Sequence, residues 1–120
     1  MKSILAAIVL ALAALGVSPS QAADWEVTVV NGTGYSIKFL GFNPPGDDDW
    51  SENEIDDVLA DGESVDVSFD SDDDCRWNIR VDWADAGYPG VLWRNVNVCD
   101  ISKITLHYDR RTDTTSITTR

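Results

Sequence analysis

The sequence has little of the chemistry that enzymes and nucleic-acid-binding proteins most often use. Its single histidine, His107, is too few for a histidine metal site or a histidine-assisted nucleophile, and there is no glycine-rich phosphate loop. Nine Lys and Arg oppose 21 Asp and Glu, a net charge of −12, and a chain this acidic is repelled by nucleic-acid backbones. We therefore expect a protein that is not an enzyme and binds no nucleic acid, with His107 in a structural role.

Residues 1–22 have the pattern of a secretory signal peptide. Lys2 supplies a positive charge and 4–15 form an apolar run too short to span a bilayer. Small residues occupy the −3 and −1 positions of a cleavage site after Ala22, with cleavage one residue later as the alternative. We expect export to the periplasm or the medium. The mature chain is predicted to be a single domain over 23–120, not membrane-embedded, with a net charge of −13 once Lys2 is removed.

Cys75 and Cys99 are the only cysteines. An exported chain folds in an oxidising compartment, so a bridge between them is predicted, with two buried thiols or an intermolecular bridge as alternatives. In the chain-entropy description, closing a loop of this length stabilises a protein by about 3 kcal/mol. This contribution matters for so small a domain, because it buries a limited share of its surface.

The mature chain reads as short runs of alternating apolar and polar residues between turns rich in Gly, Asn, Asp and Pro. This pattern predicts an all-β fold of about seven strands, a small antiparallel β-sandwich, with a small barrel as the alternative. The strand at 35–42 is expected to place Tyr35, Ile37 and Phe39 on one face. In the strand at 91–98, Trp93 competes with Leu92, Val96 and Val98 for the inward face.

Ser51 and Glu54 have the spacing of a helix-capping box, which predicts a short helical turn within 51–59. Strands that simply alternate in direction would place the loops at 43–62 and 84–90 at one end of the fold. The same count places 70–74 and 97–102 at the other end, where the two cysteines would meet.

Fourteen acids and no base lie between Phe39 and Cys75. Clustered carboxylates repel one another, so these loops either stay hydrated and solubilising or bind cations, and Ca²⁺ accepts several oxygen ligands from flexible loops. Strand alternation divides the acids into two candidate Ca²⁺ sites. The first candidate comprises Asp47, Asp48, Asp49, Glu52 and Asp85, and the second comprises Asp70, Asp72, Asp74 and Asp100. Hydrated turns are the alternative at both, and no other cofactor is indicated.

Tryptophan is abundant, with five residues. Trp25, Trp77 and Trp83 fall on apolar strand faces and are predicted to be core. Trp50 follows the acidic run and is a candidate contact for a sugar or a partner protein, the alternative being that it anchors its own loop.

Five motifs lie between Val30 and Thr105. They are Asn31-x-Thr33-Gly34-x-x-Ile37, Trp50, Gly62-Glu63-Ser64-Val65, Cys75-x-Trp77-Asn78-Ile79-Arg80-Val81 and Asn95-Val96-Asn97-Val98-Cys99. In this arrangement the chain resembles a group of small exported bacterial proteins, some of which carry the name argininosuccinate lyase. None of the signature of that large helical enzyme is present in this sequence. The resemblance implies export, a β fold and the Cys75–Cys99 pair, and it implies no catalytic residue.

These observations predict a non-catalytic exported binding or accessory domain that takes Ca²⁺ in its acidic loops. The alternative is a protein-interaction module, such as an inhibitor or a partner of envelope proteins, that uses the loop around Trp50. The partner is then an unknown protein or small ligand.

Overall fold

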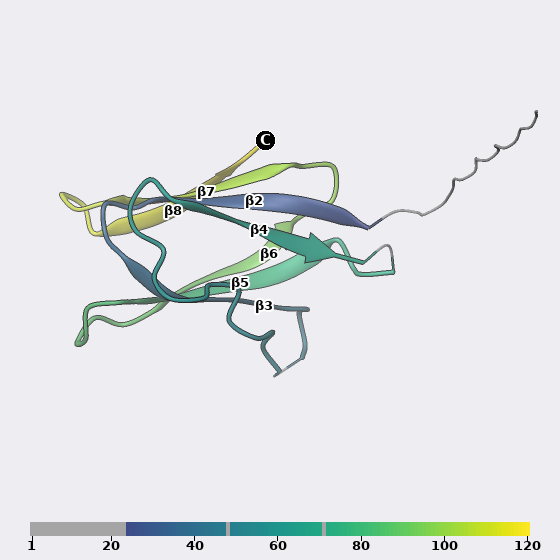
Figure 1. The fold of residues 1–120 in the computed structure, drawn as a ribbon, viewed down its shortest axis with the longest axis horizontal. Coiled ribbons are helices and arrows are strands. Elements are labelled where there is room, and N and C mark those ends of the chain that lie inside the picture. The colour runs from purple at the N-terminus through teal and green to yellow at the C-terminus, as the bar shows by residue number, and fades with distance from the viewer. Residues whose placement is uncertain (1–23, 48, 71) are drawn as a thin grey trace, which may run out of the picture.

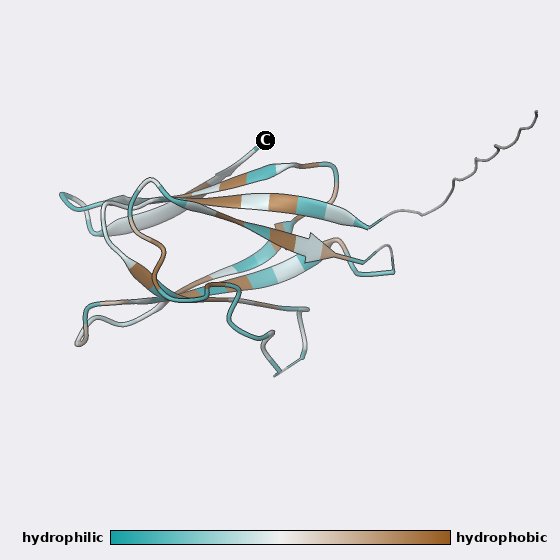
Figure 2. Cartoon of the chain, viewed as in Figure 1, coloured by the Kyte–Doolittle hydropathy of each residue, from teal (hydrophilic) through white to brown (hydrophobic). Residues whose placement is uncertain are grey.

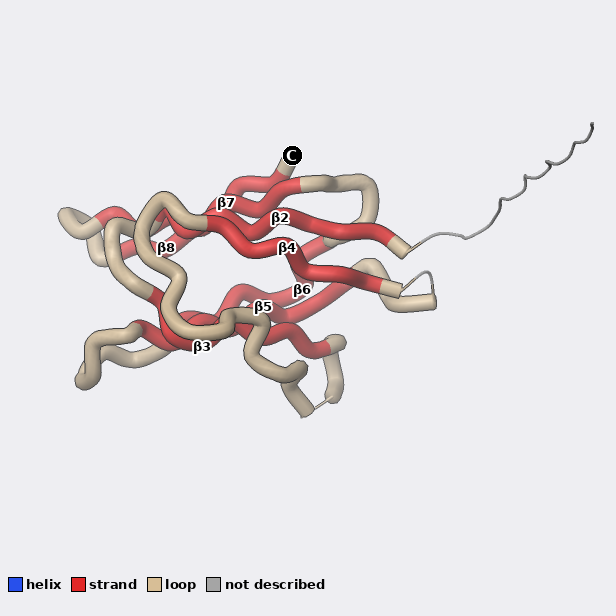
Figure 3. Tube along the Cα trace, in the orientation of Figure 1, coloured by secondary structure: helices blue, strands red, loops and turns tan. Residues whose placement is uncertain are grey.

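A computed structural model describes residues 24–47, 49–70 and 72–120, and the predicted signal peptide lies outside them. Over these residues the chain forms two facing β-sheets and no helix (Figures 1 and 3). One sheet has the strand order β4-β2-β7-β8 and the other β3-β5-β6. The strands are β2 (Trp25–Gly32), β3 (Ile37–Asn43), β4 (Ser64–Phe69), β5 (Arg76–Trp83), β6 (Val91–Asn97), β7 (Lys103–Asp109) and β8 (Thr114–Thr119). The prediction of a seven-stranded all-β sandwich is confirmed.

The connections mostly pass from one sheet to the other. Only the β5–β6 and β7–β8 connections join neighbours within a sheet. Four of the five strand pairs are antiparallel, as predicted, but β2 and β7 pair in parallel. The long route from β2 to β7 through both sheets permits this pairing, because a parallel pair needs a crossover connection rather than a tight turn.

The core lies between the sheets and follows from alternation along the strands. In β2, Val27 and Val29 are fully buried, whereas Glu26 is exposed and Thr28 is half-buried, and Figure 2 shows the change of hydropathy along this strand. In the part of the chain that the structure describes, fifteen buried hydrophobic residues make up the core: Val27, Val29, Ile37, Leu40, Phe42, Ile55, Leu59, Val67, Phe69, Ile79, Val81, Val96, Val98, Ile104 and Leu106. Trp25, Trp77 and Trp83 pack against it while partly buried.

A β-bulge in β3 changes which of its residues face the core, so the face predicted from the sequence is wrong beyond the bulge. The register of β3 against β5 shifts between Ile37 and Phe39, and an extra residue reverses the facing of the residues that follow. Leu40 and Phe42 are therefore buried instead of Phe39. Phe39 lies on the outer side, with the Arg80 guanidinium 5.3 Å from its ring centroid. The prediction that Phe39 shares a face with Ile37 is wrong for this reason.

A second irregularity, between β5 and β6, determines which residues of 91–98 face the core. The register of β5 against β6 shifts between Trp77 and Ile79, and Asn95 on β6 adopts a φ of 56°. Trp93 packs against the core before this shift, and Val96 and Val98 are buried after it. Leu92 is the member of the competing set that stays exposed.

The helical turn predicted within 51–59 is absent. This segment runs back along the outer edge of β3 and forms backbone hydrogen bonds with it: Ser51 N donates to Phe42 O, Glu54 N to Leu40 O, and Leu59 N to Ile37 O. The Ser51 hydroxyl accepts from Phe42 N instead of capping a helix. Because these backbone groups are satisfied by a strand, the helix has no advantage here. We call residues 44–63 the β3 strap.

The predicted disulfide is confirmed, since Cys75 and Cys99 are bonded with an S–S distance of 2.07 Å. Beside it, Val98 N donates to Cys75 O at 2.8 Å. The bridge ties the start of β5 to the residues after β6, on the two strands of one hairpin. No helix among the described residues is long and apolar enough to cross a membrane.

Candidate functional site

The β3 strap separates the residues of the first predicted Ca²⁺ site. Asn43, at the end of β3, pairs with Asn78 near the start of β5, so Asp47 and Asp49 follow at the end of the fold that holds the disulfide. Asp85 lies at the opposite end, because Ala84 N donates to Ser36 O just before β3. The prediction that Asp85 joins this group is therefore wrong. Glu52 is exposed on the strap, and Asp48 lies outside the described residues.

The second predicted group does lie at one end of the fold. Asp74 precedes Cys75 and Asp100 follows Cys99, so the disulfide brings these chain positions together. Asp70 and Asp72 occupy the exposed turn that leads to Asp74. The chain around the cysteines thus follows the strand count made from the sequence.

Acids at this end accept hydrogen bonds from their own turns. Asp70 N donates to Asp73 Oδ2 at 2.7 Å, and Asp49 N donates to Asp47 Oδ1 at 2.9 Å. Within the described part of the chain, no group of three or more His, Cys, Asp or Glu side chains is placed to hold a metal ion. Calcium binding stays a prediction of the sequence.

Trp50 and His107 are also placed. Trp50 is half-buried on the strap, and its role as a partner contact stays a prediction. His107 is half-buried on β7, with its Nε2 atom 3.0 Å from Thr118 Oγ1 of the neighbouring strand β8.

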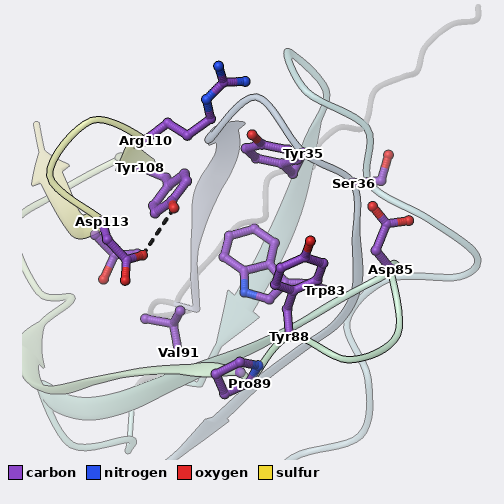
Figure 4. Close-up of a pocket in the computed structure, with 12 residues that line it drawn as sticks. Tyr35, Ser36, Trp83, Asp85, Tyr88, Pro89, Val91, Tyr108, Arg110 and Asp113 are labelled. Atoms are coloured by element: carbon purple, nitrogen blue, oxygen red, sulfur yellow. Dashed lines mark hydrogen bonds between the residues drawn. The ribbon is translucent and has the colours of Figure 1, made fainter.

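A pocket of about 620 Å³ lies at the end opposite the disulfide. All three tyrosines of the chain line it, together with Trp83 (Figure 4). The other lining residues are Ser36, Asp85, Pro89, Gly90, Val91, Arg110, Asp113 and Thr115. They come from both sheets and from three connections, so the pocket exists only in the folded sandwich. We call it the tyrosine pocket.

Three of its aromatic rings form a mutually inclined cluster. The ring centroids of Tyr35 and Tyr108 are 5.8 Å apart, those of Tyr35 and Trp83 6.4 Å, and those of Trp83 and Tyr108 6.3 Å. The interplanar angles are 66°, 75° and 55° in the same order. Tyr88 stands apart in the 84–90 turn and is 69% exposed. Its ring is therefore available to a ligand without cost to the core.

Charged groups occupy the sides of the pocket. Tyr108 Oη donates to Asp113 Oδ1 at 3.0 Å, and this hydrogen bond is the main cause that raises the pKa of Tyr108, with desolvation and the charge of Asp113 adding to it. Asp85 lies on the far side, beyond Trp83 and Tyr88 (Figure 4). Arg110 is the only cation among the described residues of the lining, and hydrogen bonding with the Tyr35 hydroxyl is the main cause that raises the pKa of its guanidinium.

Tyr35 is positioned by a buried amide. Asn31 is fully buried at the end of β2, and its Nδ2 donates to Tyr35 O at 2.7 Å and to Leu59 O at 2.8 Å. Its Oδ1 accepts from the backbone N and the hydroxyl of Thr33. This network ties the turn before Tyr35 to the strap, which fixes the backbone that carries one wall of the pocket.

The remaining walls depend on tight turns. Gly87 has a φ of 94°, in the left-handed region that glycine adopts without strain, and it precedes Tyr88. Asp113 has a φ of 51° where the chain enters β8. In the same connection Arg111 N donates to Asp109 Oδ1 at 3.0 Å. Local turn chemistry therefore sets the direction of Tyr88 and Asp113.

Nothing in the sequence pattern marks the tyrosine pocket. Trp83 has the pattern of a core residue, and Tyr35, Tyr88 and Tyr108 are far apart along the chain. The usable signal was that each tyrosine lies beside a turn or connection. Had the strap been counted as a strand, all three would have been placed at one end.

No family model, no curated protein and no solved structure matches the chain. The resemblance to small exported bacterial proteins stays a prediction, and the tyrosine pocket has to be interpreted from its own geometry.

Proposed function

We propose that the protein is a non-catalytic exported binding domain that takes a small organic ligand into the tyrosine pocket. The observation that carries the proposal is the convergence of every tyrosine of the chain on one cavity. Ligand sites are typically concave and aromatic with a few polar groups, and they are largely formed before the ligand arrives. The pocket has this composition, with Asp85, Arg110 and Asp113 as its charged groups.

A binding role fits the groups present better than catalysis does. Among the described residues, the lining contains no histidine, cysteine or lysine, and its groups able to act as acid, base or nucleophile are hydroxyls and the carboxylates of Asp85 and Asp113. The Asp113 carboxylate accepts the hydrogen bond that the Tyr108 hydroxyl donates, so it helps to position one wall of the pocket. We assign export to the same proposal, which the disulfide supports because such bridges persist in oxidising compartments.

NMR titration of the ¹⁵N-labelled, disulfide-bonded protein tests the proposal. The probes are choline, glucose, proline and benzoate, one at a time. We expect at least one probe to shift the Trp83 indole and Tyr88 amide signals, and Tyr88→Ala to abolish those shifts while the protein stays folded. Trp50→Ala is the matched control, because it removes a half-buried aromatic residue outside the pocket. If no probe perturbs the pocket, the proposal is wrong.

The same control addresses the alternative function. A pull-down that recovers a partner with wild type and Tyr88→Ala, but not with Trp50→Ala, would favour the protein-interaction module predicted around Trp50. Equal recovery with all three proteins would argue against that module.

A further inference from the structure

Resting on the proposed function, we infer that the tyrosine pocket selects an organic cation, specifically a compact alkylammonium group such as a quaternary ammonium. The inference names the class of ligand that the rings and charges of this pocket recognise.

The aromatic rings of the pocket do not lie in one plane. Sugars are commonly held against a flat aromatic face, whereas the planes of Tyr35, Trp83 and Tyr108 are inclined to each other by 55° to 75°. These three rings pack against one another and form one wall of the cavity, with Tyr88 separate from them, and the faces of such rings, unlike their edges, are electron-rich. Cations that lie within about 6 Å of an aromatic ring centroid are attracted by its quadrupole, and aromatic cages bind quaternary ammonium groups in this way.

Two of the three charged residues of the described lining are acidic. Asp113 and Asp85 lie on opposite sides of the rings, and Pro89 and Val91 form an apolar floor without charge (Figure 4). The Asp113 carboxylate is held beside the rings by Tyr108. Carboxylates at the sides and π faces around the centre favour a positive group and disfavour an anion.

Arg110 is the one cation of the described lining that would repel such a ligand. Its guanidinium lies at the rim, beyond Tyr35 and Tyr108, and points away from Trp83 and Tyr88 (Figure 4). Among the described lining residues, no cation therefore points toward Trp83 and Tyr88, whereas the Arg110 guanidinium stays close to the Tyr35 hydroxyl. The chain as a whole carries −12, and a field of this sign raises the local concentration of cations.

The test compares choline with 3,3-dimethylbutan-1-ol, which has the same shape but carries no charge. We expect NMR titration of the disulfide-bonded protein to give a dissociation constant for choline about tenfold lower than that for the alcohol. Tyr88→Leu, which removes a π face but keeps apolar contact, should weaken choline severalfold and leave the alcohol unchanged. Tyr88→Phe should retain choline binding.

Two charge variants distinguish the effect of a pocket carboxylate on choline affinity from the effect of the overall negative charge of the protein. Asp85→Asn should weaken choline, whereas Asp72→Asn, an identical charge change in the exposed 70–74 turn, should not. Equal affinity for choline and the alcohol, or equal effects of the two Asp variants, overturns the inference. Glucose or benzoate bound in place of choline overturns it too but leaves the proposed function standing, whereas absence of any bound probe refutes both.

Discussion

The two ends of the sandwich use their side chains in opposite ways. At the disulfide end, acids are numerous and adjacent in the sequence, and Asp47 and Asp73 accept hydrogen bonds from their own turns. At the tyrosine end, the important residues are few and widely separated in the sequence, and they meet only through the fold. The acids at the disulfide end are therefore neighbours because of the sequence, whereas the residues of the tyrosine pocket are neighbours only because of the fold.

The two ends of the sandwich are also stabilised by different kinds of interaction. A covalent bond joins Cys75 to Cys99 at one end, whereas at the other Asn31 connects Tyr35 and Leu59 through hydrogen bonds alone. The ends can therefore be perturbed separately, and the following experiments do so.

Removal of the disulfide should have the largest effect on stability. We expect the Cys75→Ser/Cys99→Ser double variant to lose about 3 kcal/mol of unfolding free energy, because its unfolded chain is no longer constrained. Urea denaturation measures the loss, with each single variant under reducing conditions as a control. Ligand shifts at Trp83 should persist wherever the variant is folded. Their disappearance would show that the two ends are not independent.

Asn31→Ala should destabilise the tyrosine end by about 2 kcal/mol, because the backbone groups of Tyr35, Leu59 and Thr33 each lose a hydrogen bond. Tyr35 O and Leu59 O each keep one other donor, whereas the Thr33 N–H loses the acceptor it has in the folded protein. Chemical denaturation gives the free energy, and chemical shifts at Tyr35 report the pocket. Asn97→Ala provides a control, since Asn97 is an exposed amide that accepts only from the nearby Cys99 N. A similar loss in both variants would contradict the special role of Asn31.

The Tyr108–Asp113 hydrogen bond should make a smaller, pH-dependent contribution. The folded protein holds the pKa of Tyr108 above its ordinary value of 10.0, so the contribution is complete below pH 10 and is lost as pH rises through the folded pKa. Wild type should therefore be more stable than Tyr108→Phe at pH 8, with the difference vanishing in strong alkali. Denaturation across this range checks it, and a difference that stays constant with pH would exclude the bond as its origin.

Neutralising an acid of the exposed 70–74 turn should have the smallest effect. We expect Asp72→Asn to change the unfolding free energy by less than about 0.5 kcal/mol in calcium-free buffer. Calorimetry with Ca²⁺ on chelator-treated protein then tests the calcium prediction for this end. Heat that disappears in Asp72→Asn would establish the site, whereas no heat and an unchanged melting temperature would refute it.

Much of the fold could be predicted because β alternation and a single pair of cysteines are visible in the sequence. The burial of Val27 and Val29 and the pairing of Cys75 with Cys99 are examples. The face of Phe39 could not be predicted, because a bulge depends on the register of two strands distant in sequence.

A single error in counting directions accounts for most of what was missed at the sites. The strap was interpreted as a loop at one end, yet it runs the length of β3, from Ser51 beside Phe42 to Leu59 beside Ile37. Counting it as a further strand reverses every later element relative to β3. That correction moves Asp85 away from Asp47 and brings the turn before Tyr35 to the same end as Tyr88 and Tyr108.

The strap also has a consequence for how copies of this protein meet. An open strand edge presents unpaired backbone groups that can recruit a strand from another chain. The strap occupies those groups along β3, and its exposed outer residues include Glu52, Asp56 and Asp57. A second copy that approaches this edge meets like charge instead of free amides. The acidity that dominates the sequence therefore acts as a barrier to aggregation at the edge of a sheet.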